Sequence, residues 1–389
     1  MRDSFLPFAR PEVDEESIED LCQSIRSGWL TTGPKTQAFE EDFSKTVGAT
    51  YSISVSSATA GLHLAFLGLG IEPGDEVITT PMTFVATVNA AIWAGATPVL
   101  VDIDPKTLNI DVEQLEGAIT DRTKAIVPVH FAGLPCDMDR IEAMAEKHGL
   151  AIVEDAAHAL GASYRGRPIG ADRGPRRCSV FSFHPTKNIT TGEGGMVCTS
   201  DEDLAERISV LRQHGMSKGA WNRYAAKGNP HYDVLFPGFK ANMMDIQAAI
   251  GRGQLKKLDS FNSRRKTIVD RYREAFKDQP GLTLPGTPAY DHVHSWHIFT
   301  PLVDVDKLDI DRDGFMGAMR ELNLGTALHY QALHLFSYYQ ETYRWRKGDF
   351  PNAEMVSDRI VSLPLFPAMT DFDVEDVING VRSVMESHL

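Results

Sequence analysis

The sequence has 389 residues, of which 42% are hydrophobic and 24% are charged. This length exceeds what one small domain needs, so we expect a large domain and a smaller one. Its 39 basic and 53 acidic side chains give a net charge of −14, which argues against nucleic acid or an anionic membrane surface as the main partner. A phosphate-bearing ligand stays compatible with this charge, because backbone N–H groups can bind phosphate without basic side chains.

The N-terminal segment MRDSFLPFARPEVDEES lacks the apolar core of a secretion signal, and no stretch approaches the roughly 18 apolar residues of a membrane-spanning helix. The four cysteines are Cys22, Cys136, Cys178 and Cys198. They form no CxxC pair and have no metal-binding spacing. We therefore expect a cytoplasmic protein with reduced, buried thiols and no metal site.

In chain order, the sequence first predicts a helix over residues 15–27 and then an alternation of β-rich runs with helical stretches. The β-rich runs lie at 51–57, 75–81, 97–103, 124–131, 150–156 and 178–184. The helical stretches include ATAGLHLAFLGLG and MDRIEAMAEKHG, the second of which ends at Gly149 as a C-cap. Apolar strands that alternate with helices predict a mostly parallel sheet covered on both faces.

Helical spacing of apolar residues extends over 254–276, and a Pro/Gly-rich segment follows it. Beyond that segment we expect a strand in WHIFTPLVDV and helices in DRDGFMGAMREL and DFDVEDVINGVRSVMESH. We place the domain boundary inside the long helix. The prediction is a large α/β domain over residues 1–255 and a smaller α+β domain over residues 256–389.

The segment FSFHPTKNITTGEGG carries the first candidate for chemistry. A β-rich run ends at His184, and Lys187 follows shortly after it. A lysine just past a buried strand is partly desolvated, which lowers the pKa of its amine and favours condensation with a carbonyl group. Taken alone, such a lysine is more often an ordinary surface residue.

Asp155, in EDAAHALG, ends a different apolar strand, at the edge where open α/β sheets place their ligands. A carboxylate there can pair with the pyridinium nitrogen of pyridoxal phosphate and keep the ring an electron sink. It could also be a solvated strand end or the start of a metal site, but no His/Asp cluster nearby completes a metal set. His158 follows three positions later and would stay near the same site, although a lone histidine there is more often structural.

Donors for a phosphate group are predicted in SSATAGLHLA, which follows the first strand and opens a helix. The N–H groups of Ala58 and Thr59 would then lie at the positive end of the helix dipole, and Thr59 and Ser182 could add hydroxyls. The same pattern is also an ordinary N-cap. Phe84, in PMTFVAT, offers a flat face for stacking on a cofactor ring, with a core position as the plainer interpretation.

The chain resembles the sugar aminotransferases of the DegT/DnrJ/EryC1/StrS family over nearly its whole length. The motifs that carry this resemblance are SSATAGLHLA, PMTFVATVNA, EDAAHALGA, FSFHPTKNITTGEGG, RQHG and GFKANMMDIQAAI. The resemblance implies an α/β, aspartate-aminotransferase-like (type I) fold and a pyridoxal 5'-phosphate cofactor. A finer resemblance, to the UDP-4-amino-4-deoxy-L-arabinose synthetase branch, rests on PMTFVATVNA, FSFHPTKNIT, VHSWHIF, GTALHYQALH and DRIVSLPLFPAMTDFDV.

The resemblance also implies roles for single residues. Lys187 is expected to carry the cofactor as a Schiff base, and Asp155 is expected to pair with its ring nitrogen. The residues expected to bind the phosphate or to sandwich the ring are Ala58, Thr59, Ser182, Phe84 and His158. Phe84 stands where the arabinose branch tends to have Trp.

Three further residues are expected at the substrate, and one at a subunit interface. His329 resembles a residue of the sugar pocket, and Tyr330 and His184 are expected beside it; a core histidine is the alternative for His329. Asn242, in GFKANMMDIQ, resembles a residue that reaches the cofactor phosphate of the neighbouring subunit, which implies a homodimer with shared active sites. The alternative role for Asn242 is to cap the helix that follows it.

The expected reaction moves an amino group from L-glutamate to a UDP-linked 4-keto sugar nucleotide, giving a 4-amino-4-deoxy sugar nucleotide and 2-oxoglutarate. The alternatives are an aminotransferase for a 3-keto sugar or a keto-cyclitol, and a non-catalytic regulatory member of the fold. The sugar dehydratases of this superfamily lack the lysine, so Lys187 disfavours that activity. The segments 165–178 and 216–236 depart from the arabinose branch. The first has arginines that could form a local basic patch for the nucleotide, with a solvated loop as the plainer interpretation.

Overall fold

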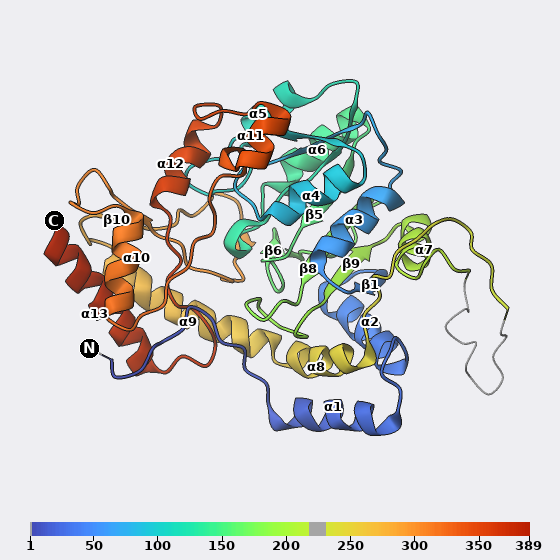
Figure 1. Ribbon diagram of the computed structural model, residues 1–389, viewed down its shortest axis with the longest axis horizontal. Helices are drawn as coiled ribbons and strands as arrows, with labels where there is room; N and C mark the ends of the chain where they lie inside the picture. Colours follow the sequence, from blue (N-terminus) through green and yellow to red (C-terminus); the bar gives the residue numbers. More distant parts are fainter. Residues whose placement is uncertain (1, 218–230) are drawn as a thin grey trace.

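The computed structural model describes residues 2–217 and 231–389, and seven strands of these residues form one sheet (Figure 1). The strands are β1 (Tyr51–Val55), β2 (Glu76–Thr79), β3 (Thr97–Leu100), β4 (Thr123–Ile126), β5 (Ala151–Asp155), β8 (Arg177–Ser182) and β9 (Gly195–Thr199). Their order across the sheet is β1-β9-β8-β5-β4-β2-β3. Each of the six predicted β-rich runs overlaps one strand, and β4 and β8 begin one residue before their runs. The sequence did not predict β9, which pairs antiparallel with both β1 and β8, while the other pairs are parallel.

Helices cover both faces of this sheet, as the alternation in the sequence predicted. The helices of this part are α1 (Glu15–Ser27), α2 (Pro34–Val47), α3 (Ala58–Gly68), α4 (Val85–Trp93), α5 (Val112–Leu115), α6 (Met138–His148), α7 (Glu202–Leu211) and α8 (Asp245–Lys256). Side chains of α2, α6 and α8 share one core with Ile126 and Ile152. Side chains of α3, α4 and α7 share another core with Ala125 and Val153, the strand neighbours that point the opposite way.

The first helix shows how local sequence sets its ends. The Asp14 carboxylate accepts a hydrogen bond from the Ser17 N–H at the start of α1, and Gly28 ends the helix in the left-handed region at φ 77°. The bounds of α1 are those predicted from the sequence. Gly149 ends α6 in the same way, at φ 67°.

The C-terminal part has its own apolar core, built around α9, α10 and α13. Its helices are α9 (Leu258–Phe276), α10 (Arg312–Glu321), α11 (Ser337–Tyr343), α12 (Pro351–Arg359) and α13 (Asp371–His388). The small strands are β6 (Ser163–Tyr164), β7 (Arg167–Pro168), β10 (Leu282–Thr283), β11 (His292–Val293) and β12 (Leu302–Val303). Of the strand predicted in WHIFTPLVDV, only the two residues of β12 form a strand. Trp296, at the start of that segment, lies at φ 47°, outside the strand region.

The long helix predicted over residues 254–276 is two helices, because α8 ends before Lys257 and α9 begins after it. Leu258 and Phe261 of α9 pack into the core under the sheet, whereas Ile268 and Tyr272 pack into the C-terminal core. This helix therefore joins the two cores. The division of the chain at residue 255 stays a prediction.

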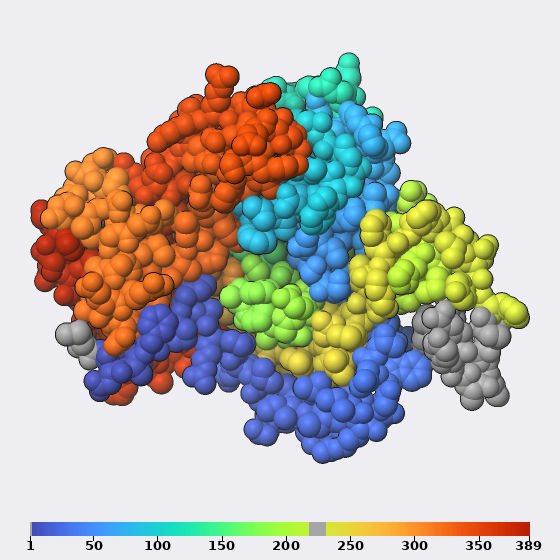
Figure 2. Space-filling model, in the orientation of Figure 1, coloured from blue at the N-terminus to red at the C-terminus, as the bar shows by residue number. Residues whose placement is uncertain are grey.

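The N-terminal residues lie against the C-terminal third of the chain (Figure 2). Leu6 pairs with Leu324 through a backbone bridge, and Arg2 forms ion pairs with Asp373 and Asp376 at 2.7 Å each. These contacts tie the start of the chain to α13. Of the helices in residues 2–217 and 231–389, none has the length and apolar character needed to cross a membrane.

Candidate active site

A cavity of about 390 Å³ lies at the carboxyl ends of the parallel strands. Asp155 is the last residue of β5 and Ser182 the last of β8, and Ser57 and Thr83 follow β1 and β2. All four residues line the cavity, because parallel strands bring their carboxyl ends to one edge of the sheet. The volume falls within the range of small-molecule sites, roughly 300–1,000 Å³.

Ten of the eleven residues that the sequence predicted for the site line this cavity. They are Ala58, Thr59, Phe84, Asp155, His158, Ser182, His184, Lys187, His329 and Tyr330. Asn242 is the exception. Most of the ten come from the sheet domain, but His329 and Tyr330 come from the C-terminal part and close the cavity from that side.

Lys187 lies in the turn after β8, where its backbone N–H donates to the His184 carbonyl at 2.9 Å. Its side chain is half-buried against the cavity wall. Burial lowers the pKa of the Lys187 amine to about 8, although the negative charge of Asp155 acts in the opposite direction. The neutral, nucleophilic amine is therefore far more populated near neutral pH than in a free lysine.

The Asp155 carboxylate is buried and held by two donors. Thr87 Oγ1 donates to Oδ2 at 2.7 Å, and the Ala157 N–H donates to Oδ1 at 3.2 Å. Sequence reasoning missed Thr87, although it lies three residues after Phe84 in the motif PMTFVATVNA. A hydroxyl in the first turn of a helix that follows a strand was the available signal.

The N-terminus of α3 forms one end of the cavity. The Ser57 side chain caps this helix by accepting from the Ala60 N–H at 3.1 Å, and Ala58 and Thr59 line the cavity. A Cβ on Gly195 of β9 would lie 2.7 Å from the Ala58 nitrogen, so glycine is required for α3 to begin this close to the sheet. The ordinary N-cap is therefore present at Ser57, and Ala58 and Thr59 follow it at the cavity; their role as phosphate donors stays a prediction.

Aromatic side chains form the walls next to Lys187. Phe84 is 56% exposed, so the core position considered for it is wrong. His158 is buried, and burial together with Lys187 and His329 holds its pKa well below the usual range, which keeps the imidazole neutral. His329 hydrogen-bonds to Ser362 through Nδ1 at 2.8 Å, and burial lowers its pKa to about 3.

Asn242 points elsewhere within its own chain. Its amide donates to Thr32 Oγ1 at 2.6 Å, and its backbone pairs with Val55. The N-cap of α8 is Met244, so the helix-cap alternative for Asn242 is wrong. Its expected contact with a second subunit stays a prediction.

The arginines of residues 165–178 do not line the cavity. Arg173 and Arg177 pair with Glu142 at 2.6 and 3.0 Å, and Arg165 pairs with Asp139 at 2.9 Å. Their charges are thus partly neutralised, and the expected basic patch for a nucleotide is not at the cavity. Of the segment 216–236, which departs from the arabinose branch, residues 218–230 lie outside the described residues.

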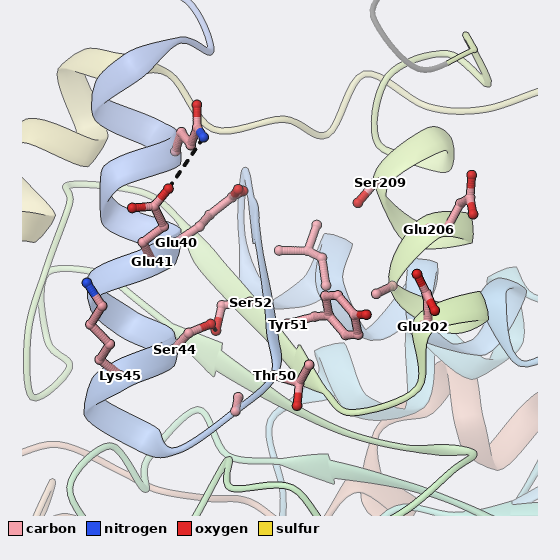
Figure 3. Close-up of a pocket in the computed structure, with 14 residues that line it drawn as sticks. Glu40, Glu41, Ser44, Lys45, Thr50, Tyr51, Ser52, Glu202, Glu206 and Ser209 are labelled. Atoms are coloured by element: carbon pink, nitrogen blue, oxygen red, sulfur yellow. Dashed lines mark hydrogen bonds between the residues drawn. The ribbon is translucent and has the colours of Figure 1, made fainter.

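A larger hollow, of about 610 Å³, lies between α2, β1 and α7 (Figure 3). It lies beside β1, the edge strand of the sheet, and holds none of the predicted site residues. Glu40 and Glu41 of α2 and Glu202 and Glu206 of α7 line it. Their carboxylates would repel a phosphate, so the smaller cavity is the candidate active site.

Solved structures match this fold along almost the whole chain. Spr1654 from Streptococcus pneumoniae, a candidate sugar aminotransferase, matches with TM-score 0.91 and 34% identity in its PMP form, covering 98% of this chain and 99% of that one. Helicobacter pylori PseC, an aminotransferase involved in the biosynthesis of pseudoaminic acid, matches with TM-score 0.90 and 30% identity, covering 99% and 100%. The fold is therefore that of the type I aminotransferases, as predicted, with a lysine and a buried carboxylate in its cavity.

The family follows from the sequence comparison. The model of the DegT/DnrJ/EryC1/StrS aminotransferase family matches residues 11–382. The spore coat polysaccharide biosynthesis protein SpsC of Bacillus subtilis is 48% identical over 386 residues, which cover 99% of this chain and 98% of SpsC. The chain belongs to the DegT/DnrJ/EryC1/StrS aminotransferase family, which confirms the predicted family.

Proposed function

We propose that this protein transfers the amino group of L-glutamate to a 4-keto sugar nucleotide carrying UDP. The observation that carries the proposal is the shared cavity of Lys187, Asp155 and the N-terminus of α3. A pyridoxal-phosphate aminotransferase needs three things from the protein: an amine of lowered pKa, a buried carboxylate and a set of phosphate donors.

The cofactor is pyridoxal phosphate, as predicted. The relative Spr1654 has been solved in PLP and PMP forms, and the residues of this cavity fit the group. The N-terminus of α3 with Thr59 and Ser182 would hold the phosphate, and Asp155 would hold the ring nitrogen. When bound, the cofactor supplies an aldehyde for covalent attachment and a ring that accepts electrons.

The protein's own groups would then position and move protons. The Asp155 carboxylate would keep a proton on the ring nitrogen, and Thr87 and the Ala157 N–H hold that carboxylate in place. Lys187 Nζ, whose pKa of about 8 lets it gain and lose a proton, would take the proton from the α-carbon of the donor and return one to the acceptor carbon. Phe84 and His158 would flank the ring.

Three observations support a sugar as the acceptor. SpsC is named for polysaccharide biosynthesis, and PseC for pseudoaminic acid biosynthesis. His329 and Tyr330 enter the cavity from the C-terminal part, where polar groups can orient sugar hydroxyls. The C-terminal motifs GTALHYQALH and SLPLFPAMTD resemble the arabinose branch, which favours a 4-keto group and UDP.

We further propose a homodimer in which Asn242 reaches the cofactor phosphate of the second subunit. Trp93 and Phe239 are 58% and 42% exposed, and both contact His63 of α3. The N-terminus of this helix lines the cavity. Exposed aromatic surface of this kind beside a binding site is typical of a subunit interface.

Two sets of measurements test the proposal, the first on amino-group transfer and the second on the acceptor. Glutamate should convert the yellow holoenzyme to the pyridoxamine form with release of 2-oxoglutarate, and Lys187→Ala should abolish the borohydride-reducible attachment of the cofactor. In the second measurement, 4-keto sugars linked to UDP, GDP and dTDP are compared with a 3-keto sugar and a keto-cyclitol. UDP-4-keto sugars should give the highest kcat/KM. A preference for GDP, dTDP or a cyclitol would overturn the assignment to the arabinose branch, but the protein would still be an aminotransferase.

A further inference from the structure

A bend next to the cavity aims a backbone amide at His158. Ala132 lies in the left-handed region at φ 56° and ψ 1°, which is uncommon for a residue with a Cβ. In this bend the Ala132 N–H lies 3.2 Å from Nδ1 of His158. Ser295 Oγ donates to the His158 carbonyl at 2.8 Å, so the backbone of the histidine is also held.

This contact decides which ring nitrogen of His158 carries the proton. A backbone N–H can only donate, so Nδ1 has to offer its lone pair. A neutral imidazole with a free lone pair on Nδ1 has its proton on Nε2. The lowered pKa of His158 agrees with a neutral ring.

The proton on Nε2 then sets the direction of the next hydrogen bond. Nε2 lies 3.0 Å from the hydroxyl oxygen of Tyr330, so His158 donates and Tyr330 accepts. Burial and the charge of Asp155 raise the pKa of Tyr330, so the phenol keeps its own proton. Because the bond to His158 uses a lone pair of Tyr330, the phenol proton is free to bond to another group.

His297 does not compete for the proton of His158. Its ring centroid lies 4.4 Å from that of His158, but among the described residues neither of its ring nitrogens has a hydrogen-bond partner. It therefore holds the imidazole by packing alone.

We propose that Tyr330 donates its phenol proton to an oxygen atom of the bound ligand. The direction of this hydrogen bond is fixed because the Ala132 N–H donates to His158, and His158 in turn donates to Tyr330. Tyr330 lines the cavity together with Lys187, so the acceptor lies close to the reacting centre. The acceptor is a phenolic oxygen on the cofactor, or a carbonyl or ring oxygen on the keto sugar. It belongs either to the cofactor or to the keto sugar, and this identity rests on the proposed function.

The first test reads the tautomer directly. Protein labelled with 15N-histidine is studied by long-range ¹H–15N NMR, without and with pyridoxal phosphate, and His158→Gln identifies the resonance. The Nε2–H tautomer is expected in the wild type and in Tyr330→Phe. Ala132→Gly is the matched control, because it keeps the N–H and tolerates positive φ. An Nδ1–H tautomer or a doubly protonated ring in the wild type would overturn the proposal.

The second test asks where the Tyr330 proton goes. If the acceptor is on the cofactor, Tyr330→Phe shifts the absorbance maximum of bound pyridoxal phosphate. If it is on the keto sugar, the variant raises KM for the ketone about tenfold, equivalent to roughly 1.4 kcal/mol, and leaves KM for glutamate unchanged. If Tyr330→Phe causes neither change although the tautomer is as expected, the donor role of Tyr330 is also overturned. Absence of any cofactor attachment at Lys187 would count against the proposed function instead, because the NMR result does not depend on it.

Discussion

Thr87 Oγ1 donates a 2.7 Å hydrogen bond to Asp155 Oδ2, and both residues are buried. Thr83 lies 2.8 Å from the same Thr87 oxygen, so the hydroxyl of Thr87 is itself oriented by a neighbour. This pair joins the helix after β2 to the end of β5. It restricts the position of the carboxylate in the cavity.

Thr87→Val is expected to lower turnover roughly tenfold to a hundredfold, because a hydrogen bond to a charged group contributes about 1.5–3 kcal/mol. The shape of the side chain is kept, so the loss comes from the missing donor. Steady-state kinetics measure it. Thr87→Ser, which keeps the hydroxyl, is the matched control and should retain most of the activity. Wild-type turnover in the valine variant would show that Asp155 needs no such support.

Asp155→Asn is expected to reduce turnover by roughly two to four orders of magnitude, since the neutral amide cannot keep a proton on the ring nitrogen. The amide oxygen can still accept from Thr87, but the amide nitrogen cannot accept from the Ala157 N–H, so the melting temperature should fall modestly without loss of folding. Rapid-mixing kinetics with glutamate, together with a thermal melt, measure the two effects. Near-normal turnover would assign the role to another residue.

The reaction of cofactor-free protein with pyridoxal phosphate should depend on pH through Lys187. Burial lowers the pKa of this amine from 10.5 to about 8, so its reactive, neutral form dominates above about pH 8. The initial rate of attachment, followed by absorbance, should rise through pH 8 and then level off. Asp155 raises this pKa, so Asp155→Asn should move the midpoint to lower pH. A rate that still rises steeply towards pH 10 would contradict the lowered pKa.

Mixing two inactive variants tests the shared site. Lys187→Ala and an Asn242→Ala variant are each expected to have little activity, one through the lost amine and the other through the lost contact to the second subunit's phosphate. Each hybrid dimer should regain one intact site, so the equal mixture at full exchange should reach up to about a quarter of the wild-type activity. Lys187→Ala mixed with itself is the control. If subunits exchange and no activity returns, Asn242 acts within its own chain, where it already bonds to Thr32.

The periodicity of the sequence was enough to predict the six parallel strands and the bounds of α1, because burial on both faces and capping are local properties. The ends of those strands also indicated Asp155 and Lys187. The antiparallel strand β9 was missed, because its residues follow the turn rich in threonine and glycine and have no distinct period of their own. The break between α8 and α9 was missed because helical spacing continues across Lys257.

By itself, then, the sequence determined the family, the alternation of strands and helices, and the residue types of the site. Only the tertiary structure decided which of these residues touch. Thr87 and Asp155 are 68 positions apart, and His158 and Tyr330 are 172 apart. No local pattern encodes such contacts, because they exist only after the strands have aligned and the C-terminal part has packed against them. The direction of a hydrogen bond follows from those contacts, and so it too is a property of the folded protein.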